Sequence, residues 1–353
     1  MKDFDHINNK KIIILTGDNN FYGQTRKPWV SMNVMAIKER LSHYSYEVNI
    51  YNIQDVFNKK ITLENEIILY SFSQKPNVRQ YIIDVLTFLN KNNTIIPSLD
   101  LLYCHENKGY QKIYKEMCGL TGLKAWYFSS LKEIDNYNIP YPIILKTITG
   151  SNGKGVFLIQ NRRDLEKRLK KLSKIEFLKS FDLFRRHYFR KKTFPEYPNH
   201  NDYEDYLQYK EYITKNENFI LQEFVPGLTY DYRILALEGK YFAMKRHTRE
   251  GDFRASGTKI FDFTFNPEDA LLNCAEKVYN HLDSPFLSMD IVFNGHEYFL
   301  IEFQASHFGV SAILKSKGYY TRIKNEWRFV KEKLNVEYEI ADALDRYILK
   351  HKI

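Results

Sequence analysis

Short apolar runs alternate with amphipathic stretches over residues 11–96. The runs are IIILTG, YEVNIY, EIILYSF and NTIIP, and the stretches 30–41 and 78–89 between them are helix-like. This alternation predicts a small α/β domain with a largely parallel sheet. Ligands of such sheets bind beyond the carboxyl ends of the strands, so we expect substrate at the polar loops 17–27 and 71–77.

The middle of the chain predicts a second subdomain built around a glycine-containing hairpin. Residues 106–127 indicate a helix followed by a strand, and Pro140 and Pro142 punctuate the chain before the next strand. The expected hairpin and its following helix comprise a strand at 143–146, a turn at 147–154, a strand at 155–160 and a charged helix at 162–172.

Residues 174–218 are basic, aromatic and irregular, and their lack of a clean period predicts an insertion. Regular patterns return after it. We expect strands at 219–224, 232–237 and 240–246, a helix at 267–282, paired strands at 287–293 and 297–303, and a helix at 324–350.

Length and composition set the class of protein. A chain of 353 residues with 44% hydrophobic residues suits two or three packed subdomains. Its apolar runs fall far short of the roughly 20 residues of a membrane-spanning helix, and the N-terminus lacks the apolar segment of a secretory signal. We therefore expect a cytoplasmic protein without a membrane span. Cys104, Cys118 and Cys274 form no CxxC pair, so we expect buried free thiols.

The net charge of +9 has two explanations. Nucleic-acid binding is one, but no nucleic-acid-binding motif appears, and the 52 basic residues are spread among 43 acidic ones. A small polyanionic substrate such as ATP explains the excess equally well.

The first candidate site is Lys146 followed by the turn GSNGKG at 150–155. Glycines let backbone N–H groups close over phosphate oxygens, and a lysine adds a positive charge. The GxxxxGK[ST] spacing of a Walker A motif is absent. An ordinary hairpin turn is the other explanation.

The second candidate is Asp290 with Glu302 and Gln304, on two predicted strands joined by Asn294-Gly295. Asn-Gly between β-rich runs predicts a hairpin, so the two carboxylates should face each other across it. Carboxylate and amide oxygens suit Mg²⁺. A solvated sheet face is the alternative.

Two further groups carry candidate chemistry. Arg233, Arg246 and Arg254 could stabilise the charge of a transferred phosphoryl group, although isolated arginines are usually solvated. The segment Gln222-Glu223-Phe224-Val225 leads into a Pro-Gly turn, where a nucleotide base could bind the main chain; an ordinary strand end is the alternative.

These pieces occur in the order PIILKTITGSNGKGV, ILQEFVPGLTYDYRILALEGKYFAMKRHTREGDFRASG and SMDIVFNGHEYFLIEFQ. The series resembles the ATP-grasp superfamily over about residues 106–309. The resemblance implies an α/β ATP-grasp fold with an N-terminal parallel-sheet domain. The implied parts are 1–105 (N-terminal substrate domain), 106–140 (connecting part), 141–225 (small subdomain with the insertion 174–218) and 226–353 (large subdomain).

The resemblance also implies a role for each matched position. Lys108 and Lys146 correspond to phosphate-binding lysines. Asp231 corresponds to a residue holding the ribose, and a role at the substrate or a phosphate is the alternative. The phosphate flap would be Ser151, Asn152, Gly153, Lys154 and Gly155; the adenine hinge Gln222, Glu223, Phe224 and Val225; the cations near the phosphates Arg233, Arg246 and Arg254; and the magnesium ligands Asp290, Glu302 and Gln304.

This chain departs from the family pattern in three places. Gln304 stands where relatives commonly have Asn, Ser256 replaces another Asn, and the insertion 174–218 is unusually long. Gln offers the same carbonyl oxygen as Asn on a longer arm, which changes the geometry of a metal site.

The implied activity is ATP-dependent ligation of a carboxylate to an amine through an acyl phosphate, with ATP and Mg²⁺ (or Mn²⁺) as cofactors. The whole-chain pattern also looks like bacterial ligases that attach amino compounds to uronic acids of surface polysaccharides. A peptide or protein ligase is the alternative, and a non-enzymatic module binding an anionic glycan or nucleic acid is a further one. Many relatives are homodimers.

Overall fold

The computed structural model describes residues 10–23, 30–73, 75–120, 122–150, 153–173, 175, 177–189, 202–215 and 217–353. The chain forms two compact units. The larger comprises Met1–Leu123, Ser151–Lys154 and Val225–Ile353, and the smaller comprises Lys124–Gly150 and Gly155–Phe224.

The N-terminal part of the larger unit forms the predicted parallel sheet. Its strands lie in the order β2 (Glu47–Asn52), β1 (Lys11–Thr16), β3 (Ile67–Tyr70) and β4 (Thr94–Ile96), all parallel. Residues 12–15 of β1 are completely buried, as expected for a sheet covered on both faces. The elements between its strands are η1 (Asp18–Asn20), α1 (Val34–His43), α2 (Asp55–Asn58) and α3 (Pro76–Leu89).

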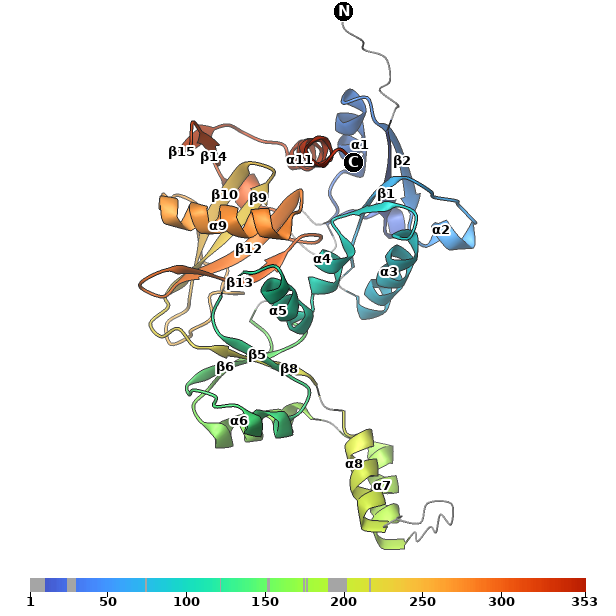
Figure 1. Cartoon of the computed structure of the whole chain (residues 1–353), viewed down its shortest axis with the longest axis vertical. Coiled ribbons are helices and arrows are strands. Elements are labelled where there is room, and N and C mark those ends of the chain that lie inside the picture. Colours follow the sequence, from blue (N-terminus) through green and yellow to red (C-terminus); the bar gives the residue numbers. More distant parts are fainter. Residues whose placement is uncertain are drawn as a thin grey trace, which may run out of the picture. The chain divides into compact units, whose positions relative to one another are not determined.

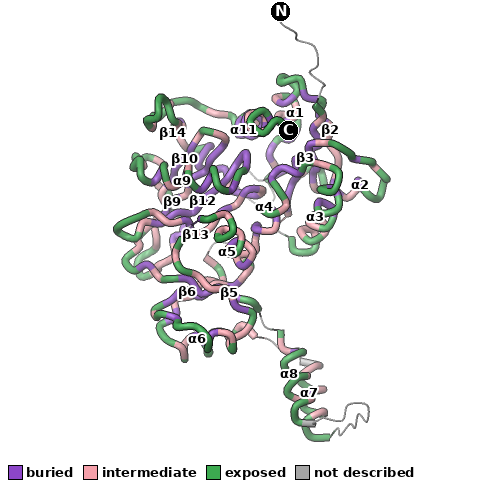
Figure 2. The backbone as a smooth tube through the Cα atoms, viewed as in Figure 1, coloured by how far each residue is buried: buried purple, intermediate pink, exposed green. Residues whose placement is uncertain are grey.

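The second sheet of the larger unit has seven strands. Their order is β13 (Tyr298–Gln304), β12 (Phe286–Phe293), β9 (Tyr230–Leu237), β10 (Lys240–His247), β14 (Gly318–Ile323) and β15 (Glu326–Lys331), and β11 (Phe261–Asp262) pairs with β10. Helix α9 (Asp269–Leu282) lies across this sheet (Figure 1). Its buried face packs on residues such as Leu287 and Met289. Much of β9, β10 and β12 is buried (Figure 2).

The other helices of the larger unit are α4 (Leu99–Cys104), α5 (Lys108–Met117), α10 (Ser311–Lys315) and α11 (Val336–His351). Several helices begin at an asparagine whose side chain accepts backbone N–H bonds: Asn33 for α1, Asn107 for α5 and Asn335 for α11. The predicted helix at 324–350 is wrong in its first part, because residues 326–331 pair with β14 and only the later part is helical.

The smaller unit is a four-stranded antiparallel sheet. Its order is β5 (Ala125–Phe128), β8 (Phe219–Glu223), β6 (Ile143–Thr147) and β7 (Val156–Ile159), with η2 (Leu131–Asn136) and α6 (Arg162–Leu172) beside it. The β6–β7 hairpin and the following helix confirm the prediction. This unit begins before Pro140 and Pro142, because β5 bonds to β8.

The insertion contains regular structure that the sequence pattern did not predict. Residues Phe177–Phe189 form α7 and Asp202–Ile213 form α8. Asp182 on α7 accepts hydrogen bonds from Arg186 and from the Tyr209 hydroxyl of α8. Exposed apolar side chains remain on the outer faces of both helices: Phe181, Phe184, Tyr188, Phe189, Tyr203, Leu207 and Tyr212.

Two further expectations concern the cysteines and a membrane span. All three cysteines are free, but only Cys104 is buried, whereas Cys118 and Cys274 are partly exposed. Among the described residues, no helix is both long and apolar enough to cross a membrane.

Candidate active site

The pairing of β12 with β13 confirms the predicted hairpin. Asp290 lies opposite Glu302, and Ser288 opposite Gln304. The Asn294 side chain closes the turn by accepting the backbone N–H bonds of His296 and Glu297, each at 2.9 Å. The two acidic residues predicted to face each other, Asp290 and Glu302, therefore occupy opposite positions on paired strands.

A β-bulge sets the direction of Glu302. The register shifts between Asp290 and Ile291, so that Ile291 pairs with Leu300 while Asp290 pairs with Glu302. Ile291 and Leu300 belong to the core beneath α9. Because an extra residue lies between Leu300 and Glu302, the bulge turns Glu302 toward the opposite face, where Asp290 lies.

Asp290 is part of a buried network of alternating charges. Arg233 donates two hydrogen bonds to it, at 2.8 and 3.0 Å, and Arg246 donates a third at 2.8 Å. Arg246 also binds both carboxylate oxygens of Asp231 at 2.6 Å. The four side chains come from β9, β10 and β12, which are neighbours in the sheet. We call them the charge network.

Burial and charge pull the pKa values of this network in opposite directions. Burial alone would raise the pKa of Asp290, but the guanidinium groups of Arg233 and Arg246 hold it well below its usual range. For Asp231, burial prevails and raises the pKa despite Arg246. Burial would lower the pKa of Arg246, but the two aspartates stabilise its charged form more strongly, so its pKa lies above the ordinary value.

The oxygens near Asp290 suit a hard cation in chemistry. Glu302 is half-buried, and its only described hydrogen bond is a long one of 3.4 Å from the Gln304 amide. The described residues contain no group of three or more acidic, His or Cys side chains placed to hold a metal. A magnesium ion here would therefore depend on two carboxylates, one amide oxygen and phosphate oxygens.

Two side chains of α5 that sequence reasoning missed bind the edge of β13. The Gln111 amide donates to the Phe303 carbonyl at 2.9 Å and accepts from the Phe303 N–H at 3.2 Å. Lys115 donates to the Ile301 carbonyl at 3.1 Å, and burial lowers its pKa to about 8. They hold the backbone on either side of Glu302. Their spacing from Lys108, three and seven residues on a predicted helix, is the signal that could have found them.

Lys108 is the first residue of α5, after its Asn107 cap. The structure thus places this predicted phosphate ligand at the start of the helix that contacts β13. It belongs to the larger unit, as do the charge network, Glu302 and Gln304.

The predicted glycine turn contains one position, Gly155, whose backbone conformation and surroundings only glycine tolerates. Gly155 has φ of +74°, and a Cβ there would lie 2.0 Å from the Thr147 hydroxyl oxygen. The Thr147 N–H donates to the Gly155 carbonyl, and its hydroxyl to the Thr149 carbonyl. Ser151 and Asn152 lie outside the described residues.

The remaining predicted nucleotide ligands lie in or beside the smaller sheet. Lys146 on β6 pairs with Val156 on β7 and with Ile220 on β8. On β8, the buried Gln222 and the exposed Glu223 precede Phe224, where the smaller unit ends, and Val225 begins the next part of the larger one. That these residues meet the acidic pair around one triphosphate stays a prediction.

Arg254 contacts the tip of the glycine turn within the larger unit. Its guanidinium group is paired with the Asp252 carboxylate at 2.9 Å and donates to the Gly153 carbonyl at 3.3 Å. These bonds fix an arginine next to a backbone predicted to close over phosphates.

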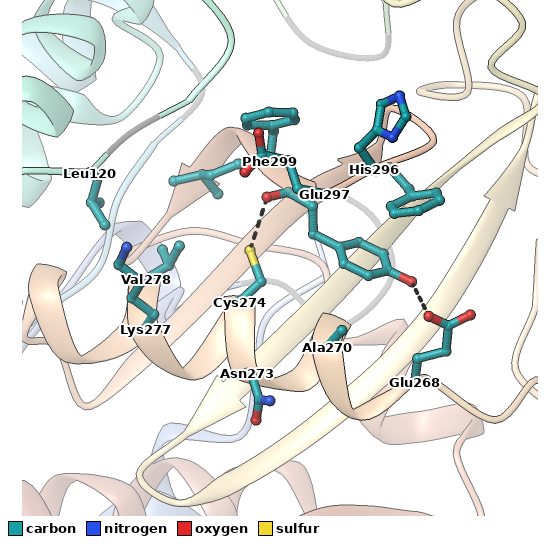
Figure 3. Close-up of a pocket in the computed structure, with 13 residues that line it drawn as sticks. Leu120, Glu268, Ala270, Asn273, Cys274, Lys277, Val278, His296, Glu297 and Phe299 are labelled. Atoms are coloured by element: carbon teal, nitrogen blue, oxygen red, sulfur yellow. Dashed lines mark hydrogen bonds between the residues drawn. The ribbon is translucent and has the colours of Figure 1, made fainter.

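A separate cavity of about 510 Å³ lies between α9 and the β12–β13 hairpin (Figure 3). It adjoins Leu300, which faces the α9 side of the sheet, opposite Asp290. The Cys274 thiol there contacts the Tyr298 carbonyl, and burial raises the pKa of this thiol to about 11. The cavity is therefore not part of the acidic site, and its thiol stays protonated at neutral pH.

Comparison with known proteins matches part of the sequence and nearly all of the architecture. A model of the RimK-like ATP-grasp domain matches residues 111–181. No curated protein sequence matches the chain.

Three solved structures illustrate the architectural likeness. A RimK domain ATP-grasp protein from Sphaerobacter thermophilus has 10% identity and a TM-score of 0.51, covering 94% of this chain and 98% of its own. D-cycloserine synthetase DcsG has 11% identity and a TM-score of 0.52, with coverages of 96% and 99%. The ATP-grasp ligase PsnB, complexed with precursor peptide PsnA2 and AMPPNP, has 10% identity and a TM-score of 0.52, with coverages of 98% and 99%.

Proposed function

Because this chain has the ATP-grasp fold, we propose that it is an ATP-dependent carboxylate–amine ligase. A carboxylate oxygen attacks the γ-phosphorus of ATP and releases ADP. The amine nitrogen then attacks the acyl carbon, phosphate leaves, and the amine loses a proton. The observation that carries this proposal is the acidic pair Asp290–Glu302 beside buried arginines, at the ladder positions of β12 and β13.

We assign nucleotide binding to both units. Lys108 and Lys146 would bind phosphate oxygens, as would backbone N–H groups of the turn that contains Ser151, Asn152, Gly153 and Gly155. The segment from Gln222 to Val225 would hold adenine. The ribose role expected for Asp231 competes with its two bonds to Arg246, so its support for this role is weaker.

Asp290, Glu302 and Gln304 would hold Mg²⁺. The ion, when bound, neutralises charge on the transferred phosphoryl group. Glu302 suits this role best, because both ends of its strand segment are fixed by α5 and its carboxylate has no described ion pair. For Asp290, three guanidinium bonds occupy most of its acceptor capacity.

The arginines would stabilise the negative charge of the transferred phosphoryl group and acyl phosphate. Arg233 and Arg246 are held in place by Asp290 and Asp231, and Arg254 by Asp252. Donors fixed before the reaction need no reorganisation as charge develops, which is the main source of electrostatic catalysis.

We propose an acidic sugar of a surface polysaccharide, or its precursor, as the carboxylate. Helix α7 exposes Phe184, Arg185, Tyr188 and Phe189 on consecutive turns, and Arg185 would exchange its exposed ion pair with Asp182 for the carboxylate of the sugar. Aromatic rings stack on sugar faces, and guanidinium groups pair with carboxylates. The PsnB complex makes peptides the second class to test.

The direct test measures ADP and AMP release from ATP and Mg²⁺ with a panel of acids and amines. The acids are glucuronate, galacturonate and short acidic peptides; the amines are single amino acids and hydroxylamine. We expect ADP release that depends on both an acid and an amine, with a uronic acid as the better substrate. AMP release would contradict the acyl phosphate, and a preference for peptides would contradict the sugar.

The acidic site is tested by Glu302→Gln, which keeps the size of the side chain. We expect turnover to fall by at least about 100-fold, the loss typical of a group that stabilises transition-state charge. Glu297→Gln, an exposed acid on the same hairpin, is the matched control and should keep wild-type activity. Equal activity of the two variants would remove Glu302 from the site.

A further inference from the structure

Two pairs of buried or half-buried polar side chains, joined through consecutive residues that follow β13, lie where β3 ends and where α4 passes into α5: His105 is near His307, and Tyr70 is near Ser306. They are Tyr70, His105, Ser306 and His307, and we call them the polar cluster. The His105 ring packs edge-on against Phe72 with centroids 4.2 Å apart, and its centroid lies 6.0 Å from that of His307. All of these residues belong to the larger unit.

His105 lacks the partners that a buried imidazole normally has. Its exposed fraction is 4%, and neither ring nitrogen has a hydrogen-bond partner among the described residues. The hydroxyls of Tyr70 and Ser306 interact weakly with each other, and neither makes a hydrogen bond of ordinary geometry to the described protein. Buried polar groups without protein partners destabilise a fold, so their retention needs another explanation.

The backbone beside His105 is strained as well. Glu106 has φ of +53°, in the left-handed region that residues other than glycine, asparagine and aspartate rarely adopt. Such strain persists where the surrounding structure imposes it, and it concentrates at functional sites. Here it lies at the junction that presents the His105 ring.

The position of the polar cluster suits a substrate. Tyr70 ends β3, and in parallel sheets ligands bind beyond the carboxyl ends of the strands. Ser306 and His307 follow directly after the strand that carries Glu302 and Gln304. Two members of the polar cluster, Ser306 and His307, are therefore close in sequence to Glu302 and Gln304, which we assign to Mg²⁺ at the phosphates.

The charges of the polar cluster select the kind of group it can bind. Burial lowers the pKa of His105 well below its usual value, with His307 and Arg79 adding to the effect, and burial lowers the pKa of His307 to about 4. At neutral pH both rings are uncharged, so they cannot balance a carboxylate. The positive charge of Arg79 also disfavours an ammonium ion. An uncharged amine, the form whose lone pair attacks an acyl group, fits these conditions.

We propose that the polar cluster binds the amine substrate, with a ring nitrogen of His105 accepting a hydrogen bond from its uncharged amino group and the Tyr70 hydroxyl binding a neighbouring polar atom. The assignment rests on the proposed ligase activity. It names these residues as contacts of the nucleophile, separate from those for ATP and the acid.

The first test compares the stability of free protein variants by thermal unfolding. His105→Phe and Tyr70→Phe keep the ring volume and remove the polar atoms. Since the His105 nitrogens have no described hydrogen-bond partner, and the Tyr70 hydroxyl has none of ordinary geometry, both variants should unfold at or above the wild-type midpoint. Tyr279→Phe is the matched control: its buried hydroxyl bonds Glu238 at 2.7 Å and the Pro285 carbonyl at 3.2 Å, so its midpoint should fall. A similar fall for His105→Phe would mean that internal water holds the ring, which overturns the proposal.

The second test measures KM for the amine that gives turnover in the amino acid panel. His105→Phe should raise this KM at least about tenfold, the effect of one lost hydrogen bond to a buried group, and leave KM for ATP unchanged. An unchanged amine KM overturns the proposal. Lack of ADP release by the wild type with every acid and amine contradicts the ligase activity instead, and then the unfolding comparison alone decides whether the cluster is built for a ligand.

Discussion

The charge network shows how single buried residues depend on one another. Arg246 is 3% exposed and has both aspartates as partners. Removing one partner from a buried ion pair leaves a charge without compensation, which costs about 3–5 kcal/mol. We expect Asp231→Ala to lower the free energy of unfolding by about that amount, measured by urea denaturation.

Asp252→Ala is the matched control for this variant. Asp252 also makes a two-point pair with Arg254, but their side chains are 27% and 39% exposed. Water therefore compensates the arginine, and pairs of this kind contribute less than about 1 kcal/mol. Equal losses for the two aspartates would show that Arg246 is not as desolvated as its burial indicates.

The two buried histidines predict a pH dependence of stability. Their pKa values are lower in the folded protein than the ordinary value of 6.5, about 4 for His307 and well below 6.5 for His105. The unfolded chain therefore binds more protons below pH 6.5, and the free energy of unfolding falls as the pH drops. Each ring contributes a slope of about 1 kcal/mol per pH unit between roughly 6 and 4.

Urea denaturation at pH 7, 6 and 5 would measure this slope. His105→Phe should reduce it by the contribution of one ring. Asp290 and Asp342 do not interfere in this range, because their pKa values lie below 3.8 and their contribution is lost only at lower pH. The raised pKa of Asp231 adds a slope of opposite sign, which is the same in both proteins and cancels when they are compared. An unchanged slope in the variant would mean that His105 is protonated without cost.

At the residue scale, the sequence predicted which residues are candidates for the site better than it predicted their hydrogen-bond partners. The Asn294-Gly295 signal sufficed to predict the hairpin that carries Asp290 and Glu302. It could not give the register, because the loop covers residues 294–297 between the paired Phe293 and Tyr298, and only the bulge after Asp290 brings Glu302 opposite it. It could not show that Asp290 accepts bonds from Arg233 and Arg246. That contact depends on the order β10-β9-β12, which involves strands from distant parts of the sequence.

At the scale of elements, helix α5 satisfies backbone hydrogen bonds at the edge of the sheet, where β13 has no neighbouring strand on one side. The Gln111 amide forms both bonds that a neighbouring strand would offer to Phe303. Gln111→Leu leaves two buried backbone groups without partners, so we expect a loss of about 2–4 kcal/mol in the free energy of unfolding. Urea denaturation measures this loss.

Gln80→Leu provides the comparison for this change. Gln80 also lies on a helix, but it is exposed, and among the described residues its side chain bonds the Asp84 carboxylate alone. It should lose less than about 0.5 kcal/mol, as surface substitutions generally do. If Gln111→Leu costs no more than Gln80→Leu, then α5 does not hold the edge strand.

Element prediction succeeded where periodicity was clear and failed where other forces decided. Helix α6 was predicted with its bounds, since its leucines recur at helical spacing among charged residues and pack as one face on the core of the smaller unit. Residues 326–331 form a strand because β14 pairs with them, which no local pattern reveals. The irregular pattern at 174–218 concealed α7 and α8, because their aromatic residues point both toward each other and outward.

On the scale of the whole molecule, the alternation of strands and helices in the sequence was enough to predict the parallel N-terminal sheet. It could not predict that Met1–Leu123 and Val225–Ile353 share one compact unit, with α1 bonded to α11 through Arg40 and Asp342 at 2.6 Å. Such long-range pairing is absent from local patterns. It matters for the proposed function, because it places the polar cluster and the acidic pair in one compact unit.

Ligand binding provides the test at this scale, because a ligand that binds only the folded state raises the stability of the whole chain. At 100 times its dissociation constant, Mg²⁺–ATP should add about 2.7 kcal/mol to the free energy of unfolding. We expect a higher thermal midpoint with Mg²⁺–ATP than with ATP and EDTA, since the acids would otherwise repel the phosphates. Glu302→Gln should lose most of the magnesium-dependent part while Glu297→Gln keeps it. A midpoint that responds to neither form of ATP would contradict nucleotide binding by this fold, and a response independent of magnesium in the wild type would remove the metal from Asp290, Glu302 and Gln304.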